Sequence, residues 1–417
     1  MGVAARRYWI PATLSSDLPQ PDCDPIRVEL LGETFVAFRD TEGKIGFLDE
    51  ACCHRGASLT LGRVEGCGIR CIYHGWKFAV DGTVMETPNV ADPNFKTRFK
   101  ARAYPTHEAG GLIWVYLGPA HQQPAFPRWR WFDIPASQRI VTVHVMECNF
   151  VQVLEGLVDS SHLGILHTNG LRATADSDLA YAVKVGTMQF DLAPRLQAED
   201  TEFGFHYAAL RSLPSEHGPV TEARVTAFVA PFTVVNANGD VVTIVVPAND
   251  ERSRFFHVFW DTQRALGEEP LSSEHLAFVG LDAQSLAAYG ISTRIANDSA
   301  RPRYSNRFHQ DRESMRAGNF SGMRGLIEED VAVSVASGPL RDRSKERLTV
   351  ADVAVSKLHR VLLGAARRAQ ESKDPIGINA DVATIAGSNA ILAPDQAWQS
   401  LAPGHRRERH DIAADSE

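Results

Sequence analysis

Cys52-Cys53-His54 and, after sixteen intervening residues, Cys71-Ile72-Tyr73-His74-Gly75-Trp76 decide how this chain is interpreted. Each segment pairs one cysteine with one histidine, as Cys52-x-His54 and Cys71-x-x-His74. A [2Fe–2S] cluster with two cysteines on one iron and two histidines on the other uses this ligand set, and its potential lies at about −150 to +300 mV. A structural Cys2His2 zinc site is the alternative. Zinc fingers pair like with like, whereas each segment here mixes the two ligand types, so the pattern favours the cluster.

The composition is that of an ordinary globular protein of one large domain or two. The chain has 417 residues, of which 44% are hydrophobic and 23% charged. It has no apolar run long enough to span a membrane and no apolar signal core at its N-terminus, so neither a membrane span nor secretion is expected. A net charge of −8 argues against a nucleic-acid partner. Six cysteines do not make a disulfide scaffold, so a cytoplasmic protein with reduced thiols is expected.

The first third of the chain is predicted to be an all-β domain. Residues 26–119 contain short apolar or alternating segments that are separated by turns such as Asp81-Gly82. Short strands joined by turns are typical of a small sandwich or barrel, in which the two cluster segments would be loops. Residues 121–135 are rich in proline, glutamine and aromatics, and we interpret them as the connection to a second domain. The first domain is therefore placed at residues 1–135.

Residues 136–395 are predicted to form a second, α+β domain with a long antiparallel sheet. The predicted strands are Ile140–Met146, Arg224–Ala230, Asp240–Val246 and Phe255–Trp260. A long helix is predicted after Thr349-x-x-Asp352, which is similar to a capping box. Residues 396–417 are polar and are expected to form a mobile tail.

The stretch Asn149-Phe-Val-Gln-Val-Leu-Glu-Gly-Leu-Val-Asp-Ser-Ser-His-Leu-Gly-Ile-Leu-His167 is a second candidate chemical centre. On one helix, Glu155, Asp159 and His162 would share a face, because they are spaced i, i+4 and i+7. His162 and His167 would then lie about 140° apart. Both can bind one metal ion only if the helix breaks between them, and Gly164 offers such a break.

Two histidines and one carboxylate that leave open coordination positions are the facial triad of non-haem Fe(II) oxygenases. The candidate carboxylate is Asp330, in the helix-like stretch Ile327-Glu-Glu-Asp-Val. Taken alone, His162 and His167 would be interpreted as solvated or core histidines. The cluster motif upstream reverses that interpretation, because an oxygenase needs an electron source beside its iron.

These motifs resemble the catalytic (alpha) subunit of the Rieske non-haem iron oxygenases, and specifically the phthalate dioxygenase group. The resemblance is carried by the segments Cys52–Ser58, Cys71–Phe78, Glu147–Gly156, Asp159–His162 and Gly338–Glu346. It extends over about residues 6 to 368. Two positions depart from the family pattern: Cys53 replaces the usual proline, and Phe150 replaces the usual tryptophan or tyrosine.

The resemblance implies an N-terminal Rieske domain followed by a helix-grip (START-like) catalytic domain, assembled as a homotrimer or a hexamer of stacked trimers. Each subunit would hold one [2Fe–2S] cluster and one mononuclear Fe(II). The cluster of a neighbouring subunit would supply the electron, with Asp159 bridging its His74 to His162. A carboxylate that accepts N–H bonds from two imidazoles fixes their tautomers and links the two metal sites.

The resemblance also implies the reaction, which is the insertion of oxygen from O2 into an aromatic substrate. Aryl carboxylates similar to phthalate, benzoate or phenoxybenzoate are the expected substrates. NADH would act through a separate flavin and ferredoxin-type reductase, because this chain has no Gly-x-Gly-x-x-Gly fingerprint. A monooxygenase that removes an alkyl group from an aryl ether or amine is the alternative. A pure electron-transfer ferredoxin is a rival of another class, and the His162/His167/Asp330 set speaks against it.

Four further residues are candidates for the pocket. Arg211 and Arg224 are proposed to recognise a carboxylate, although each could instead be a surface or interface arginine. Asn149 and Gln152 are expected near the iron, where they shape the pocket or gate water, unless they serve only packing and helix capping.

Cys53 and Cys67 have no expected role and are interpreted as buried thiols, with an accidental bridge between them as the alternative. Rieske proteins of respiratory complexes join their two cluster loops by a disulfide. The matching positions here are Ala57 and Ile72 or Tyr73, so that disulfide cannot form.

Overall fold

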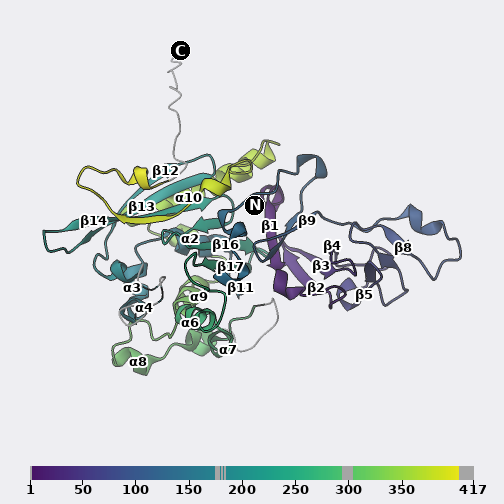
Figure 1. The fold of residues 1–417 in the computed structure, drawn as a ribbon, viewed down its shortest axis with the longest axis horizontal. Coiled ribbons are helices and arrows are strands. Elements are labelled where there is room, and N and C mark those ends of the chain that lie inside the picture. Colours follow the sequence, from purple (N-terminus) through teal and green to yellow (C-terminus); the bar gives the residue numbers. More distant parts are fainter. Residues whose placement is uncertain (1, 174–178, 180–181, 183–184, 294–303, 403–417) are drawn as a thin grey trace, which may run out of the picture.

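The computed structural model describes residues 2–173, 179, 182, 185–293 and 304–402. Figure 1 shows an all-β part on the right and an α+β part built on one large sheet on the left. This arrangement confirms the predicted fold class. The domain boundaries at residues 135 and 395 stay predictions.

Three small antiparallel sheets make up the N-terminal part. The first contains β1 (Trp9–Leu14), β10 (Leu112–Tyr116) and β9 (Thr106–Ala109), in that order. The second contains β2 (Ile26–Leu30), β3 (Glu33–Arg39) and β4 (Ile45–Asp49). The third contains β5 (Arg63–Glu65), β6 (Gly68–Arg70), β7 (Lys77–Phe78) and β8 (Val84–Glu86). The predicted Asp81-Gly82 turn joins β7 to β8, and Gly82 has a φ of +84° there.

An eight-stranded antiparallel sheet forms the centre of the second part. Its order is β11 (Arg139–Met146), β17 (Ser253–Trp260), β16 (Val241–Pro247), β15 (Thr233–Val235), β14 (Val220–Val229), β13 (Gly204–Leu213) and β12 (Arg195–Asp200), with β18 (Ser388–Ile391) paired to β14. All four predicted strands are present, with bounds that differ by a few residues. β12, β13, β15 and β18 were not predicted.

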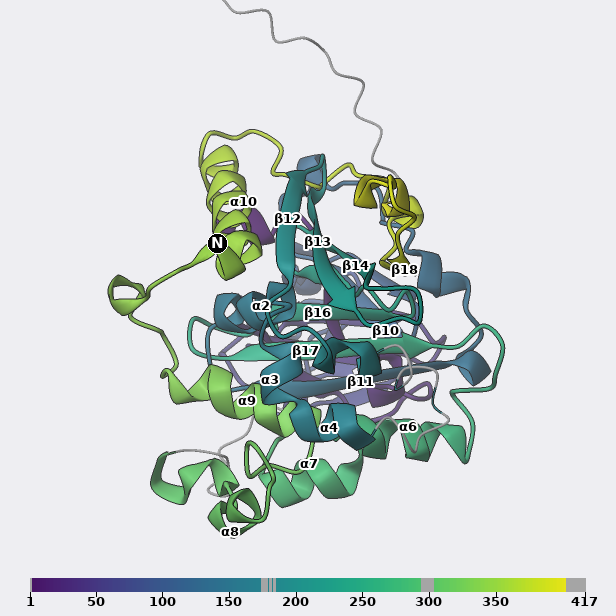
Figure 2. The ribbon, with the colours of Figure 1, turned by 90° about the vertical axis from the view of Figure 1, so that its left-hand side faces the viewer.

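Two amphipathic helices, α2 (Phe150–Val158) and α10 (Val353–Gln370), pack against the large sheet and against each other (Figure 2). The other helices are α1 (Gly2–Ala5), α3 (Leu163–Leu166), α4 (Thr168–Ala173), α6 (Leu271–Val279), α7 (Ala283–Tyr289), α8 (Arg312–Arg316) and α9 (Leu326–Ala336). The predicted capping box precedes α10, where the backbone N–H of Thr349 donates to Asp352 at 2.7 Å.

Polar contacts tie the two parts of the molecule together. The backbone N–H of Leu31 donates to the carbonyl of Pro247 at 3.0 Å, beside a side-chain bond from Asn249 to Glu29 at 2.6 Å. The first helix, α1, packs on α10. The junction is therefore held by backbone as well as by side chains.

The beginning of the predicted tail is packed rather than free. Trp398 is 3% exposed and its indole N–H donates to Gln197 in β12 at 2.7 Å. Residues 396–402 thus continue the folded domain, because a buried indole holds them to the sheet. Residues 403–417 lie outside the described residues. In the described part of the chain, every helix is too short or too polar to cross a membrane.

We predict that Leu358→Ala in α10 lowers the free energy of unfolding by about 2–5 kcal/mol, because it opens a cavity at a side chain that is 0% exposed. Leu363→Ala, in the same helix but 56% exposed, is the matched control and should cost less than about 1 kcal/mol. Urea denaturation followed by far-UV circular dichroism measures both. Equal losses would contradict the packing of α10 on the sheet.

Candidate functional site

The two Cys/His segments fold into loops with the same hydrogen-bond pattern. The backbone N–H of Cys52 and that of Cys71 each donate across their own loop, at 2.9 and 2.8 Å. The two cysteine carbonyls accept from Gly56 and Gly75, at 2.8 and 3.0 Å. Both glycines have a positive φ, +73° and +76°, which disfavours any other residue. The sequence therefore builds two similar loops.

The loops face each other with sulfur inside and imidazole outside. Cys52 and Cys71 are 3% and 2% exposed, while His54 and His74 are half-buried with ring centroids 4.6 Å apart. Burial, together with the nearby Cys71, raises the pKa of the Cys52 thiol to about 11. This donor set fits a binuclear cluster with its cysteine side buried and its histidine side near the surface.

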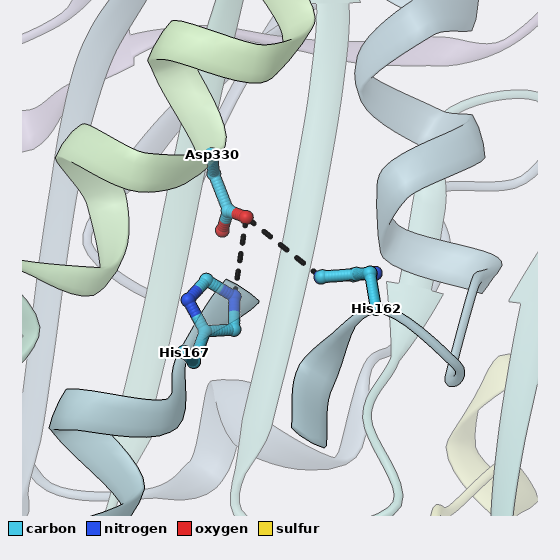
Figure 3. Close-up of side chains that lie close together, drawn as sticks. All are labelled: His162, His167 and Asp330. Carbon is cyan, nitrogen blue, oxygen red and sulfur yellow. Dashed lines mark ion pairs between the residues drawn. The ribbon is translucent and has the colours of Figure 1, made fainter. Parts of the chain in front are cut away.

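The second candidate centre brings together the three ligands predicted for it (Figure 3). His162 and His167 stand at the two ends of the single-turn helix α3, and Asp330 projects from α9. One Asp330 oxygen lies 3.8 Å from His162 Nε2 and 3.2 Å from His167 Nε2. Three ligand atoms on one side leave the other side open for further ligands.

The local path of the chain differs from the one predicted. α2 ends at Val158, so Glu155 and His162 do not share a helix face. The interruption predicted between His162 and His167 lies at His167, where α3 ends and α4 follows, rather than at Gly164, which lies inside α3. A Cβ at Gly164 would lie 2.7 Å from the Met188 carbonyl oxygen, so the glycine permits close packing instead.

Glu155 is not part of the group of candidate metal ligands. Its buried carboxylate binds the guanidinium groups of Arg341 and Arg343 and lies 2.5 Å from His359 Nε2. Burial opposes its charge, but the hydrogen bond with His359 and the charges of Arg343 and Arg341 keep the pKa of Glu155 below its usual value. Glu155 is therefore an anchor between α2, α10 and the segment after α9.

Glu329, which the sequence interpretation missed, holds His167 from behind. Its Oε2 lies 2.7 Å from His167 Nδ1, and its Oε1 accepts from Ser321 Oγ at 2.6 Å. Burial disfavours an imidazolium, but Asp330 and Glu329 outweigh it and raise the pKa of His167 to about 10. Such a concentration of negative charge suits a cation. The available signal was that Glu329 immediately precedes a predicted ligand.

Asp159 contacts one of the candidate metal ligands and is partly exposed. Its Oδ2 is 3.5 Å from His162 Nδ1, and its Oδ1 accepts from the backbone N–H and hydroxyl of Ser161 at 2.7 and 2.6 Å. Its side chain remains 23% exposed. Although burial opposes its charge, His162 and Ser161 lower the pKa of Asp159. The carboxylate can accept a second N–H bond from outside the chain.

A cavity of about 470 Å³ opens beside the three candidate ligands. Its wall is largely apolar and includes Arg224, which is 3% exposed and donates to Asn238. Arg211 is 1% exposed and is not among the lining residues; it donates to the Ser160 carbonyl at 2.7 Å. Neither arginine is a surface residue in this chain, and only Arg224 is placed to meet a ligand.

Asn149 and Gln152 have structural contacts. Asn149 caps α2, accepting from the Val151 N–H at 3.1 Å. Gln152 borders the cavity, but its amide donates to the Gly338 carbonyl at 3.0 Å and accepts from the Arg341 N–H at 2.9 Å. These contacts favour the packing and capping alternative for both.

Two buried histidines near the cavity were also missed. His144 in β11 and His257 in β17 stack with ring centroids 5.1 Å apart, and His257 lines the cavity. Both nitrogens of His144 and Nε2 of His257 have no hydrogen-bond partner among the described residues. Burial lowers the pKa of His144 to about 4 and that of His257 as well, so both rings are neutral at pH 7. In the sequence, His144 and His257 lie within two predicted strands, and no motif marks them as functional.

Cys53 and Cys67 are free thiols, and Cys53 is exposed rather than buried as predicted. The neighbouring Cys52 takes the buried position of this loop, at 3% exposed.

Comparison with known proteins identifies both parts. Residues 8–105 match the Rieske [2Fe-2S] domain family, and residues 115–416 match the LigXa C-terminal domain like family. The chain is 38% identical to the phthalate 4,5-dioxygenase oxygenase subunit of Pseudomonas putida, over 96% of this chain and 90% of that protein. It is 32% identical to the 3-chlorobenzoate-3,4-dioxygenase oxygenase subunit of Comamonas testosteroni, over 88% and 85%.

A more distant relative is the 5,5'-dehydrodivanillate O-demethylase oxygenase subunit of a Sphingobium species, 27% identical over 92% of this chain and 80% of that one. Among solved structures, a mutant of NdmA from Pseudomonas putida superposes with a TM-score of 0.60, over 94% of this chain and 98% of that chain, at 17% identity. That likeness supports the fold alone.

We predict that Glu329→Gln weakens Fe(II) binding at the His162/His167/Asp330 site by about 10-fold, because a charged partner of a ligand histidine is lost. Glu328→Gln is the matched control; Glu328 is equally buried but accepts from the Arg324 N–H instead. Anaerobic Fe(II) titration measures the affinity. Equal affinities in the two variants would contradict the role given to Glu329.

Proposed function

Because this chain belongs to the Rieske oxygenase alpha subunits, we propose that it inserts oxygen from O2 into an aromatic carboxylate, as the oxygenase component of a multicomponent system. The observation that supports it most is the placement of a 2-His-1-carboxylate set beside a mainly apolar cavity that contains a buried guanidinium. An aromatic ring needs apolar walls, and a carboxylate needs a cation within them.

The substrate class follows from this cavity and from the relatives. Phthalate and 3-chlorobenzoate, named for the two relatives above, are both aryl carboxylates. Arg224 would bind the carboxylate, with Asn238 holding the guanidinium in place. The neutral His257 offers a further hydrogen-bonding position on the same cavity wall.

His162, His167 and Asp330 would hold the mononuclear iron, and Cys52, His54, Cys71 and His74 the cluster. When bound, these groups supply electrons and the reductive activation of O2. Glu329 would accept a hydrogen bond from Nδ1–H of His167, which leaves Nε2 to face the iron site. The apolar wall excludes bulk water from the reaction. Dihydroxylation consumes one O2, two electrons and two protons per ring.

The electrons come from a separate reductase, as the relatives' description as oxygenase subunits implies. We propose that it is a flavin and ferredoxin-type protein that uses NADH. The cluster loops lie on the side of the molecule formed by β5–β8, far from α3 and α9 (Figure 1). This separation supports electron delivery from a neighbouring subunit in a trimer, or in a hexamer of stacked trimers. The exposed edge of Asp159 would then accept a bond from the neighbour's His74.

Removal of an alkyl group from an aryl ether is the second candidate. The 27% identity to an O-demethylase subunit favours it, and the same candidate ligands would serve. The products separate the two: a cis-diol retains both oxygen atoms, whereas demethylation yields a phenol, formaldehyde and water. Assays of aromatic acids and their methyl ethers, with a surrogate reductase and NADH, test both activities.

We predict that Asp159→Asn keeps both metal centres but lowers turnover by at least about 100-fold. The neutral amide has one acceptor oxygen in place of two, so it cannot accept N–H bonds from two imidazoles as the carboxylate does. Iron and sulfide quantification confirms the metal content, and NADH-coupled product formation measures turnover. Asp133→Asn, at an exposed carboxylate 69% accessible, is the control. Turnover similar to wild type in a fully loaded Asp159→Asn protein would refute the role.

We predict that Arg224→Gln raises the KM for benzoate-type acids by roughly 10- to 100-fold, the effect of losing a charge-assisted hydrogen bond. The KM for an uncharged analogue such as the corresponding amide should change little. Arg195→Gln, at an exposed arginine in β12, is the matched control. An unchanged KM for the acids would show that Arg224 does not bind the carboxylate.

A further inference from the structure

The part of the chain that bears the cluster loops is basic, although the protein is acidic. Residues 52–103 hold eight lysines and arginines against four aspartates and glutamates, whereas the whole chain has a net charge of −8. A local field of opposite sign steers partners of complementary charge toward one face and speeds their association. This region therefore favours an acidic partner.

Several of these cations border one open groove. The groove is lined by residues of the β8 hairpin and of the segment after it: Thr83, Val84, Met85, Lys96, Thr97, Arg98, Phe99 and Lys100. We call it the Lys96–Lys100 face. Arg98 pairs with Asp92 at 3.3 Å and Lys100 with Asp81 at 3.4 Å, with every partner at least 44% exposed. Exposed pairs of this kind are weak and can be exchanged for a partner's carboxylates.

An aromatic path leads from this face to the cluster loops. Phe99 is 44% exposed, and its ring centroid lies 5.8 Å from that of the buried Trp76. The Trp76 indole is stacked parallel on the His54 imidazole, with centroids 4.6 Å apart and 1° between the planes. Asn89 fixes the indole by accepting its N–H at 2.8 Å. The surface of the groove is thus joined to a candidate cluster ligand by ring contacts.

The other candidate histidine has different surroundings. The ring of His74 contacts that of Tyr73, at 3.9 Å between centroids, and Arg55 lies over the Tyr73 ring at 5.3 Å. Ile72 and Tyr73 are 59% and 53% exposed. The two imidazoles lie 4.6 Å apart but have different ring neighbours, Trp76 for His54 and the exposed Tyr73 for His74.

We propose that the Lys96–Lys100 face is the docking site of the electron donor, an acidic one-electron carrier of the [2Fe–2S] ferredoxin class. In each encounter the reduced donor loses one electron, which passes by way of Phe99, Trp76 and His54 to the cluster. No bond is made or broken. This inference rests on the proposed function, in which His74 faces Asp159 of a neighbouring subunit, and it separates electron entry from electron exit.

The test uses the holoenzyme and a plant-type [2Fe–2S] ferredoxin as the probe. Isothermal titration with the oxidised probe at low salt measures binding without turnover. Stopped-flow mixing with the reduced probe measures the rate constant of cluster reduction. The variant Lys96→Gln/Arg98→Gln/Lys100→Gln should weaken binding and slow reduction by about 10-fold or more at low salt, with a smaller dependence on ionic strength. Phe99→Leu should slow reduction while changing binding less than 3-fold.

The control variant removes three exposed charges outside the groove: Lys44→Gln/Arg63→Gln/Arg128→Gln. Arg63 lies in β5, the strand at the opposite edge of the sheet from β8. If this control impairs binding as much as the groove variant does, net charge and not this face controls docking, and the proposal fails. It also fails if the groove variant changes the oligomeric state in light scattering while probe binding is unchanged, because the face would then contact a second copy of the chain.

Dithionite distinguishes this failure from failure of the proposed function. It reduces the cluster without docking, so both triple variants should be fully reduced by it and give wild-type spectra. A holoenzyme that dithionite cannot reduce would refute the function itself. A holoenzyme that dithionite reduces normally, but whose reduction by ferredoxin is unaffected in the groove variant, would refute only the docking site.

Discussion

Two consecutive carboxylates of α9, Glu329 and Asp330, contact the two ring nitrogens of His167. The candidate iron site depends on these two contacts. Consecutive residues of a helix point about 100° apart, so Glu329 and Asp330 can both reach one imidazole only if the ring lies across the helix. That geometry fixes the orientation of the His167 ring, with Nδ1 toward Glu329 and Nε2 toward Asp330. It also requires α9 to lie beside α3, although the two are more than 150 residues apart in the sequence.

The contacts of Gly338–Glu346, the segment after α9, explain its role in the fold, which its sequence motif did not reveal. Arg341 and Arg343 both bind Glu155, and the Arg341 N–H bonds to Gln152. The segment Gly338–Glu346, which carries part of the family resemblance, thus fastens α2 from outside. Because Asp159 directly follows α2, these contacts also determine where the Asp159 carboxylate lies. The charges of Glu155, Arg341 and Arg343 therefore position α2 and take no part in the chemistry.

The sequence was sufficient for those features that depend on local chemistry. Cys52-x-His54 and Cys71-x-x-His74 predicted two similar loops. This motif in turn favoured a metal site at His162 and His167, with Asp330 as the candidate carboxylate. It was insufficient where a distant contact overrides a local pattern. The i, i+4, i+7 spacing suggested one face, but α2 ends before that face is complete, and Arg341 and Arg343 draw Glu155 elsewhere. Burial of Arg211, His144 and His257 depends on strand pairing, which periodicity does not specify.

The junction between the two parts determines more than the shape of one chain. A backbone bond from Leu31 to Pro247 and the pairing of Asn249 with Glu29 resist rotation of one part on the other. In a cyclic assembly, the turning angle from one subunit to the next decides how many subunits close the ring. If the loops of one chain must reach Asp159 of the next, the contacts at the junction determine that angle. A few contacts far from either metal centre would therefore set the number of subunits in the ring.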